Sequence, residues 1–271
     1  MKLGGYNYPM PLKRALRPVV RTIRYAGLRS NDVLLASYPR SGSTWLRFLL
    51  VELLTRREAE WADVNKAIPY AGEHRHAPPL LPGGGRLVQT HERSVGPARR
   101  AVYLARDYRD VVLSEYRLTL RGGSRKDLDA FLSDALAGDA SPFGFWADHV
   151  YFWLDSDIAR TDNLLLVKFE ELKTQPAATL RTIVSFLELN VPDKSIHAAI
   201  ENNSVDRMRQ KEERAPSTEV KRASDGHQFV GQGSVRGWQS KLTVDQASAI
   251  ERRAYSAFLR LGYPVHEQAE T

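Results

Sequence analysis

A turn rich in glycine and hydroxyl side chains occupies residues 38 to 45, which read Tyr-Pro-Arg-Ser-Gly-Ser-Thr-Trp. It joins an apolar run to a helix-like run, and the first N–H groups of a helix lack partners while the helix dipole favours negative charge. Gly42 lets the backbone approach a ligand, and Arg40 adds a permanent cation. Hydroxyl donors come from Ser41, Ser43 and Thr44. The turn predicts an anion site, although an ordinary capped turn can share this composition, and it lacks the lysine of a Walker A loop.

Three further segments carry residues suited to the same chemistry. Arg106 follows an apolar run, and Ser114 lies eight residues on, about two turns into the next predicted helix. His91 closes another apolar run, and an imidazole there can act as a general base because histidine titrates near neutrality. The glycines within residues 229 to 238 allow a loop to wrap around an anion. Taken singly, each has an ordinary alternative: an ion-paired surface arginine, a structural histidine and a plain surface loop.

The elements that must position these side chains follow from hydrophobic periodicity. Strands are expected at residues 32–37, 86–90, 101–105 and 164–168. Helices are expected at residues 44–56, 109–120 and 127–137, after Pro176, and from about residue 245 to 261. This alternation predicts a three-layer α/β/α fold with a central, mainly parallel sheet. Ligands of such sheets bind at the carboxyl ends of the strands, where Arg40, His91 and Arg106 fall.

Two segments are predicted to be irregular. Residues 77 to 85 are punctuated by proline and glycine. Residues 202 to 236 are polar, basic and poor in apolar periodicity. So long an irregular stretch is usually functional, and we expect it to be a lid over the ligand, with a plain surface loop as the alternative.

Composition narrows the classes of protein. The chain has 271 residues and no cysteine, which excludes disulfides, thiolate catalysis and cysteine zinc sites. No apolar run is long enough for a transmembrane helix and no signal core precedes Leu12, so a cytoplasmic protein is expected. The net charge of +7 is densest in a basic N-terminal extension, residues 1–30. That extension is expected to be a solvated helix face, or at most a peripheral membrane contact, and no motif indicates a nucleic-acid partner.

In order and combination, these segments resemble the sulfotransferases that use 3′-phosphoadenosine 5′-phosphosulfate (PAPS). Residues 38–45 look like that family's 5′-phosphosulfate loop, usually Tyr-Pro-Lys-Ser-Gly-Thr-Thr-Trp. Thr90-His91 is similar to its Lys-Thr-His, and Arg106 with Ser114 is similar to its 3′-phosphate pair. Residues 169–176 resemble its Tyr-Glu-Asp-x-x-x-x-Pro segment, and residues 229–243 resemble its C-terminal glycine-rich segment.

The resemblance implies one sulfotransferase domain, residues 1–271, with a P-loop-like fold. The residues implied for the 5′-phosphosulfate are Arg40, Ser41, Gly42, Ser43 and Thr44. Trp45 would stack on the adenine with Phe169 near it, and the 3′-phosphate would be held by Arg106, Ser114, Gly233 and Ser234. His91 would take the proton of the acceptor, while Arg40 would stabilise charge on the leaving oxygen. PAPS would be the donor and 3′,5′-adenosine bisphosphate (PAP) the product, without a metal.

The sequence departs from the family pattern in ways that affect cofactor affinity more than cofactor identity. Arg40 replaces a lysine, Gln89 replaces a lysine beside the base, and Phe169 replaces a tyrosine. Gly231-Gln232 replaces an Arg-Lys pair, for which Arg236 is a candidate substitute. Thr243-Val244 matches the centre of a family dimer motif without its charged ends, so a monomer or weak homodimer is expected.

The acceptor is expected to present a hydroxyl, or an amine, on a small molecule, lipid or glycan. Its pocket would be shaped by loops around residues 68–85, 117–124 and 142–153, although the aromatic residues of the last are more typical of a core. Glu73, His74 and His76 lack further ligands nearby, so no metal site is expected. The alternatives are an ATP-dependent phosphotransferase on a P-loop-like fold and a basic module that binds nucleic acid or membrane.

Overall fold

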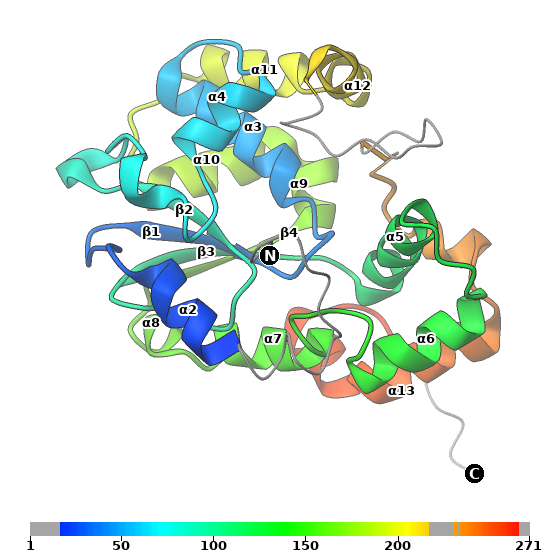
Figure 1. Ribbon diagram of the computed structural model, residues 1–271. Helices are drawn as coiled ribbons and strands as arrows, with labels where there is room; N and C mark the ends of the chain where they lie inside the picture. The colour runs from blue at the N-terminus through cyan, green and yellow to red at the C-terminus, as the bar shows by residue number, and fades with distance from the viewer. Residues whose placement is uncertain (1–16, 217–229, 232, 266–271) are drawn as a thin grey trace.

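Four parallel strands form the centre of the protein. The computed structural model describes residues 17–216, 230–231 and 233–265 (Figure 1). The strands are β1 (Val33–Ser37), β2 (Leu87–Thr90), β3 (Arg100–Ala105) and β4 (Leu164–Lys168), in the order β2-β1-β3-β4. All three neighbouring pairs are parallel. The predicted fold class, a mainly parallel α/β sheet, is confirmed.

Helices cover both faces of the sheet (Figure 1). One face is covered by α3 (Ser43–Thr55), α4 (Trp61–Ala67), α9 (Phe169–Thr174), α10 (Pro176–Phe186), α11 (Asp193–Asn202) and α12 (Val205–Arg214). The other face carries α2 (Arg17–Tyr25), α5 (Tyr108–Arg121), α6 (Leu128–Ala137), α7 (Trp146–Leu154), α8 (Asp157–Arg160) and α13 (Val244–Leu261). Single 3₁₀ turns are η1 (His74–His76), η2 (Pro82–Gly84) and η3 (Gly237–Ser240).

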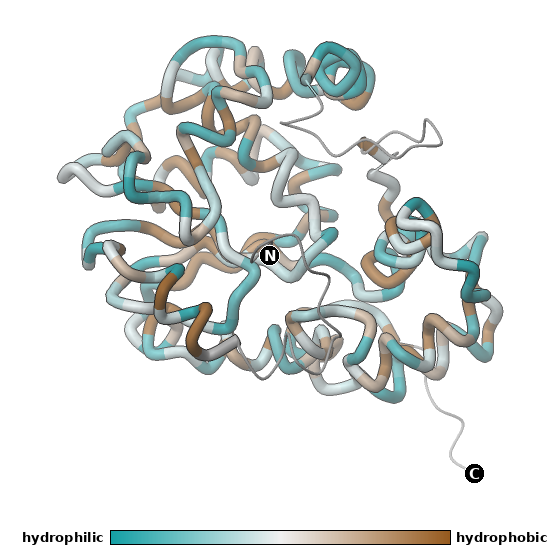
Figure 2. The backbone as a smooth tube through the Cα atoms, in the orientation of Figure 1, coloured by the Kyte–Doolittle hydropathy of each residue, from teal (hydrophilic) through white to brown (hydrophobic). Residues whose placement is uncertain are grey.

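The core divides into two hydrophobic clusters because strand side chains alternate between the faces of a sheet. Leu34 belongs to the cluster formed with α5, α7 and α13, and Leu35 belongs to the cluster formed with α3, α4 and α10. Figure 2 shows hydrophobic residues along the central strands and more hydrophilic ones on outer helices such as α12. Gly138 and Gly262 end α6 and α13 in the left-handed conformation, as their positions predict.

The prediction that residues 202–236 form one irregular segment was wrong for its first part. Residues 205–214 form α12, which packs against the domain. Its buried side chains are Met208, Lys211 and Glu212, so two thirds of its buried stripe is charged and gives no apolar periodicity. Residues 217–229 and 232 lie outside the described residues, as do residues 1–16 of the N-terminal extension.

Two of the expected acceptor loops are largely helical. The end of α5 includes residues 117–121, and α7 includes residues 146–153. Trp146 and Trp153 of α7 are fully buried and stack on Tyr108 and Tyr103 respectively. These aromatic side chains therefore belong to the core. Within the ranges that the structure describes, no helix combines the length and apolar character needed to cross a bilayer.

Candidate active site

The carboxyl ends of the strands bring the predicted segments around one cavity of about 270 Å³. The glycine turn follows β1, His91 follows β2, Arg106 follows β3 and Phe169 follows β4. The predicted residues that line the cavity are Arg40, Gly42, Ser43, Thr44, Trp45, His91, Arg106, Ser114, Phe169, Gly233 and Ser234. Ser41 is fully buried within the turn and does not line the cavity. Sheet topology therefore gathers residues that are far apart in the sequence.

The turn before α3 exposes its backbone to the cavity. Gly42 is the N-cap of α3 with φ 96°, and no side chain caps this helix. A Cβ at Gly42 would lie 2.4 Å from the ring of Phe169, so the turn can close only around glycine. Ser43 and Thr44, in the first turn of α3, also line the cavity. Their N–H groups have no acceptor within the helix, which makes this end of α3 suited to an anion.

Buried arginines give the cavity positive charge. Arg40 Nε donates to Ser114 Oγ at 3.0 Å, and Arg106 donates to the carbonyls of Arg40 and Ser234, both at 3.1 Å. Burial, reinforced by neighbouring arginines, lowers the pKa of Arg40 to about 10. Burial also lowers the pKa of Arg106. Arg40 still carries its proton near neutrality, so an anionic ligand would relieve the repulsion among these cations.

Two buried polar atoms of this site have no hydrogen-bond partner among the described residues: Ser41 Oγ and Arg106 Nε. An unpaired buried polar group costs about 1–3 kcal/mol. The Arg106 guanidinium also lies 4.3 Å from the centre of the Phe169 ring, which fixes its plane. Both atoms can donate a hydrogen bond, so the donor set fits a ligand with anionic oxygens, such as a phosphorylated nucleotide.

An apolar, aromatic end of the cavity adjoins the arginines. The Trp45 and Phe169 rings lie 6.1 Å apart in an edge-to-face arrangement. The Lys173 ammonium lies 5.2 Å from the centre of the Trp45 ring, and α12 contributes Val205 and Met208 to the lining. A flat aromatic surface bordered by apolar side chains suits the stacking of a nucleobase.

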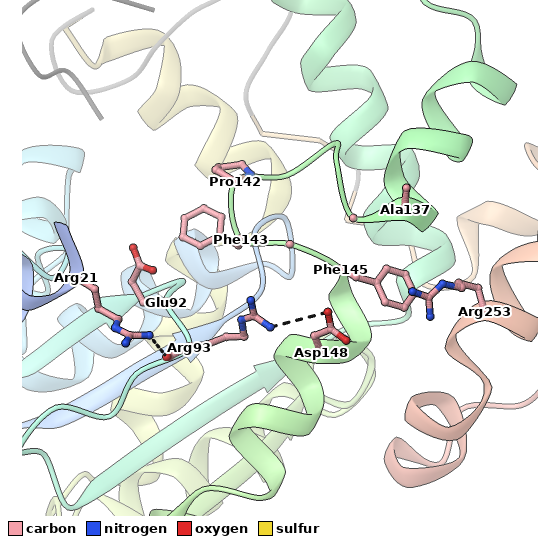
Figure 3. A pocket seen from close by; sticks show the side chains of 11 residues that line it. Arg21, Glu92, Arg93, Ala137, Pro142, Phe143, Phe145, Asp148 and Arg253 are labelled. Atoms are coloured by element: carbon pink, nitrogen blue, oxygen red, sulfur yellow. Dashed lines mark hydrogen bonds and ion pairs between the residues drawn. The ribbon is translucent and has the colours of Figure 1, made fainter. Parts of the chain in front are cut away.

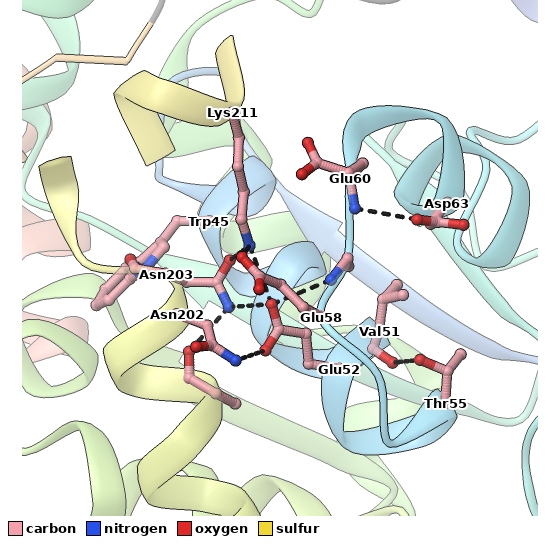
Figure 4. A network of polar contacts seen from close by, with 12 residues as sticks. Trp45, Val51, Glu52, Thr55, Glu58, Glu60, Asp63, Asn202, Asn203 and Lys211 are labelled. Atoms are coloured by element: carbon pink, nitrogen blue, oxygen red, sulfur yellow. Dashed lines mark hydrogen bonds and ion pairs between the residues drawn. The ribbon is translucent and has the colours of Figure 1, made fainter. Parts of the chain in front are cut away.

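A buried ion pair fixes α12 beside this aromatic end (Figure 4). Lys211 Nζ lies 3.1 Å from both Glu52 Oε1 and Asn203 Oδ1, and the Lys211 side chain is fully buried. The Asn203 amide donates to Glu52 Oε1 at 2.9 Å, and Asn202 donates to the other carboxylate oxygen at 3.0 Å. The backbone carbonyl of Asn203 accepts from Trp45 Nε1 at 2.8 Å. One network therefore holds both α12 and the Trp45 indole.

His91 lies next to the glycine turn with a defined tautomer. Its Nδ1 is 2.7 Å from the carbonyl oxygen of Ser37. Because a carbonyl only accepts hydrogen bonds, Nδ1 must carry a proton, and in the neutral imidazole Nε2 then holds the lone pair. The imidazole lies between the rings of Tyr70 and Phe143, at centroid distances of 5.7 Å and 5.5 Å. In this state His91 can accept a proton only at Nε2.

Several residues of the lining are additional to the predicted cofactor site: Lys173, Asn203, Val205 and Met208. Tyr70 and Arg117 also line the cavity, and both lie in segments that were expected to shape the acceptor pocket. Lys173 lies four residues after Phe169, one turn along α9, so helical spacing carried a signal for it. Asn203, Val205 and Met208 belong to residues 202–236, the segment expected to be a lid over the ligand, but no sequence pattern singles out these three residues within it.

Of two further sequence departures, Gln89 acquires a structural context and Gln232 does not. Gln89 is buried, and its Nε2 donates to Ser37 Oγ at 3.3 Å, next to the residue that holds His91. Gln232 lies outside the described residues. His74 is buried and its Nδ1 accepts from the N–H of Gly72, which gives it a structural role. Across the described ranges, no group of three or more potential metal ligands gathers.

Comparison with known proteins establishes the family. A family model described as the sulfotransferase domain matches residues 86–259, well over half of the chain. The chain belongs to the sulfotransferase family. Its predicted enzyme class, a PAPS-dependent sulfotransferase, is confirmed, and PAPS is the donor.

This sulfotransferase is similar along most of its length to curated and solved relatives. It is 24% identical over 273 residues to Sulfotransferase 2A2 of Mus musculus, covering 92% of this chain and 94% of that protein. It is 24% identical over 240 residues to Sulfotransferase 2A1 of Homo sapiens, covering 83% of each. The structure of mouse sulfotransferase SULT7A1 complexed with PAP matches with a TM-score of 0.67 and 20% identity over 88% of each chain. Retinol dehydratase in a complex with retinol and PAP matches with a TM-score of 0.68 and 18% identity, over 93% of this chain and 88% of that one. These structures share the fold of this sulfotransferase.

Proposed function

We propose that this sulfotransferase transfers the sulfuryl group of PAPS to a hydroxyl of a small-molecule or glycan acceptor, with His91 as the general base. The observation that carries the proposal is the 2.7 Å contact between His91 Nδ1 and the Ser37 carbonyl. It leaves the lone pair on Nε2, where it can take the acceptor's proton as the new S–O bond forms. A base beside an anion-binding turn is the arrangement that sulfuryl transfer requires, because nucleophile and leaving group must lie in line.

The two phosphate ends of PAPS are proposed to bind to different segments. The 5′-phosphosulfate would be held at the start of α3 by Arg40, Gly42, Ser43 and Thr44, which line the cavity, and by Ser41, which is buried within the same turn. The 3′-phosphate would be held by Arg106, Ser114, Gly233 and Ser234. The adenine would lie on Trp45, near Phe169 and α12. The unpaired donor at Arg106, which lines the cavity, supports the assignment of the 3′-phosphate.

Bound PAPS supplies an activated sulfuryl group whose transfer leaves negative charge on a bridging phosphate oxygen. Arg40 and the first-turn N–H groups of α3 would stabilise this charge, since fixed donors in a partly dry site stabilise a developing anion without reorganising. The bond from Arg40 Nε to Ser114 limits the motion of the guanidinium. Because arginine keeps its proton, we assign Arg40 an electrostatic role and no proton transfer.

The acceptor is proposed to enter from a second cavity of about 370 Å³, whose lining includes Glu92 and Phe143 (Figure 3). Phe143 lines this acceptor-side cavity, and its ring contacts the His91 imidazole. Glu92, the residue after His91, lines it as well. An acceptor bound there could direct a hydroxyl towards Nε2 of His91. The binding of retinol and of androsterone by retinol dehydratase supports an acceptor of small-molecule size.

A two-stage experiment tests the proposal. PAP binding is measured by calorimetry, and turnover of PAPS with a panel of hydroxyl acceptors is followed by mass spectrometry. His91→Ala should keep PAP binding and lose about 100-fold or more in kcat, the usual contribution of a general base. His76→Ala, which changes an exposed histidine, is the matched control. Retained turnover in His91→Ala would remove His91 as the base, and no PAP binding at millimolar concentration would overturn the assigned donor site.

A further inference from the structure

Three arginines from separate parts of the chain meet at the acceptor-side cavity. Arg21 lies on α2, Arg93 lies in the segment after β2, and Arg253 lies on α13. Figure 3 shows Arg21 and Arg93 on one side of the cavity and Arg253 on the other. Cations that converge from distant elements on one cavity create a local positive potential that attracts anions.

The carboxylates in the lining neutralise this charge only in part. Glu92 Oε1 accepts from Arg24 at 3.3 Å, and Arg24 does not line the cavity, so that carboxylate already has a partner. Asp148 Oδ2 lies 3.9 Å from Arg93, and both side chains are about half exposed. So long and exposed a pair contributes little stability and is easily replaced by a ligand.

Arg21 and Arg253 contact groups that carry no formal charge. Arg21 donates to the backbone carbonyl of Arg93 at 3.1 Å. The Arg253 guanidinium lies 4.4 Å from the centre of the Phe145 ring, a contact made through the flat face of the cation. Neither arginine forms an ion pair with a carboxylate of the described residues. Their edge N–H groups remain suited to carboxylate or phosphate oxygens.

The rest of the lining is apolar, and one of its rings contacts the proposed base. Pro142, Phe143 and Phe145 supply it, and the Phe143 ring is 5.5 Å from the His91 ring. A molecule with an anionic group at the arginines and an apolar body against Phe143 would have its other end directed towards His91.

We propose that the acceptor of this sulfotransferase carries an oxyanion group in addition to its hydroxyl, and that Arg21, Arg93 and Arg253 bind this group and so orient the hydroxyl towards His91. The proposal rests on the proposed function of the same site, since it assumes that the acceptor enters by this cavity. It assigns the three arginines to specificity and gives them no part in the transfer itself.

The test compares three phenols of similar size whose para substituents are anionic, neutral and cationic: para-hydroxyphenylacetate, its amide and the amine tyramine. Sulfation of each is measured with saturating PAPS, and binding of each to the PAP-loaded protein is measured by calorimetry. The acid should bind best and the amine worst. Arg21→Gln and Arg253→Gln should each raise the KM of the acid about tenfold, since one charge-assisted hydrogen bond contributes about 1.5 kcal/mol. Their kcat for the acid and their kinetics with the amide should stay close to those of the parent protein.

Arg252→Gln is the matched control, because it removes the same charge from an exposed neighbour that does not line the cavity. It should leave all three KM values unchanged. The inference is overturned if the amide or amine binds as well as the acid, if none of the three binds to the PAP-loaded protein, or if Arg253→Gln affects all three phenols equally. These outcomes are distinct from failure of the proposed function, which would appear as lost PAP binding or as turnover that does not need His91.

Discussion

Replacing Lys211 by methionine tests how α12 is held at the nucleotide site. The Lys211 side chain is fully buried, it bonds to Glu52 and Asn203, and its ammonium also lies 3.5 Å from Glu58. Methionine keeps an apolar side chain but removes the cation, which also lies 5.4 Å from the centre of the Phe48 ring. The carboxylate of Glu52, whose side chain is 4% exposed, then has no buried counter-charge. Breaking such a pair from one side costs about 3–5 kcal/mol.

The expected magnitude lies towards the lower end of that range. Amide donors from Ala59, Asn202 and Asn203 remain on the Glu52 carboxylate and would stabilise its charge in the variant. In a domain of this size, about 1 kcal/mol shifts Tm by about 2–4 °C, so Lys211→Met should lower Tm by about 6–12 °C. It should also weaken PAP binding about tenfold, because the network orients the Trp45 indole.

Arg214→Met is the control on the same helix. Arg214 pairs with Glu60 at 2.7 Å, but the two side chains are 56% and 46% exposed, so its loss should cost less than about 1 kcal/mol. The double variant Glu52→Gln with Lys211→Met should recover part of the loss, since no charge stays buried. Thermal unfolding and calorimetry measure both effects. If Lys211→Met destabilises no more than Arg214→Met, the buried pair does not hold α12 and the reasoning fails.

Three further variants test the site and its electrostatics. Gly42→Ala should abolish PAP binding in calorimetry, because a Cβ would lie 2.4 Å from the Phe169 ring; normal affinity would contradict the geometry of the turn. Arg106→Ala should weaken PAP far more than adenosine 5′-monophosphate, and equal weakening would refute its assignment to the 3′-phosphate. Burial raises the pKa of Glu115 from 4.5 to about 8, so the folded protein binds an extra proton between these values and its stability falls as pH rises through them. Glu115→Gln should remove this loss of unfolding free energy, which is at most about 1.4 kcal/mol per pH unit, and so flatten the fall in Tm between about pH 5 and 8. An unchanged slope would mean that Glu115 is ionised in the fold.

Sequence could predict the strands and the amphipathic helices because each depends on a local pattern. The apolar runs that end at Ser37, Thr90 and Ala105 form the strands, and Gly138 and Gly262 end their helices with φ of 80° and 66°. Parallel strands in one sheet have their carboxyl ends at one edge, so residues that follow them must meet. The composition of the cavity was therefore accessible from motifs at strand ends, without knowledge of side-chain packing.

The features that sequence did not predict depend on partners far along the chain. Lys211 can be buried because Glu52 neutralises it from α3, 159 residues away, and no local pattern records that pairing. The aromatic run of α7 is more typical of a core than of a pocket, but the choice is settled only when Tyr103 and Tyr108 are known to stack on Trp153 and Trp146. Buried polar networks and aromatic stacking are set by tertiary structure, so they limit prediction from local sequence.

Arg40 can stabilise negative charge but cannot transfer a proton, whereas a lysine at this position could do both. Its guanidinium is fixed by Ser114, its carbonyl accepts from Arg106, and its backbone adopts φ 66°, a conformation that costs a non-glycine residue about 1–2 kcal/mol. Such strain persists when the surrounding contacts over-determine it, and the bonds to Ser114 and Arg106 do so here. A pKa lowered to about 10 still leaves Arg40 protonated at neutral pH. We therefore expect proton transfer to depend on His91, whose Nδ1–H is held by the Ser37 carbonyl, while the arginines stabilise charge.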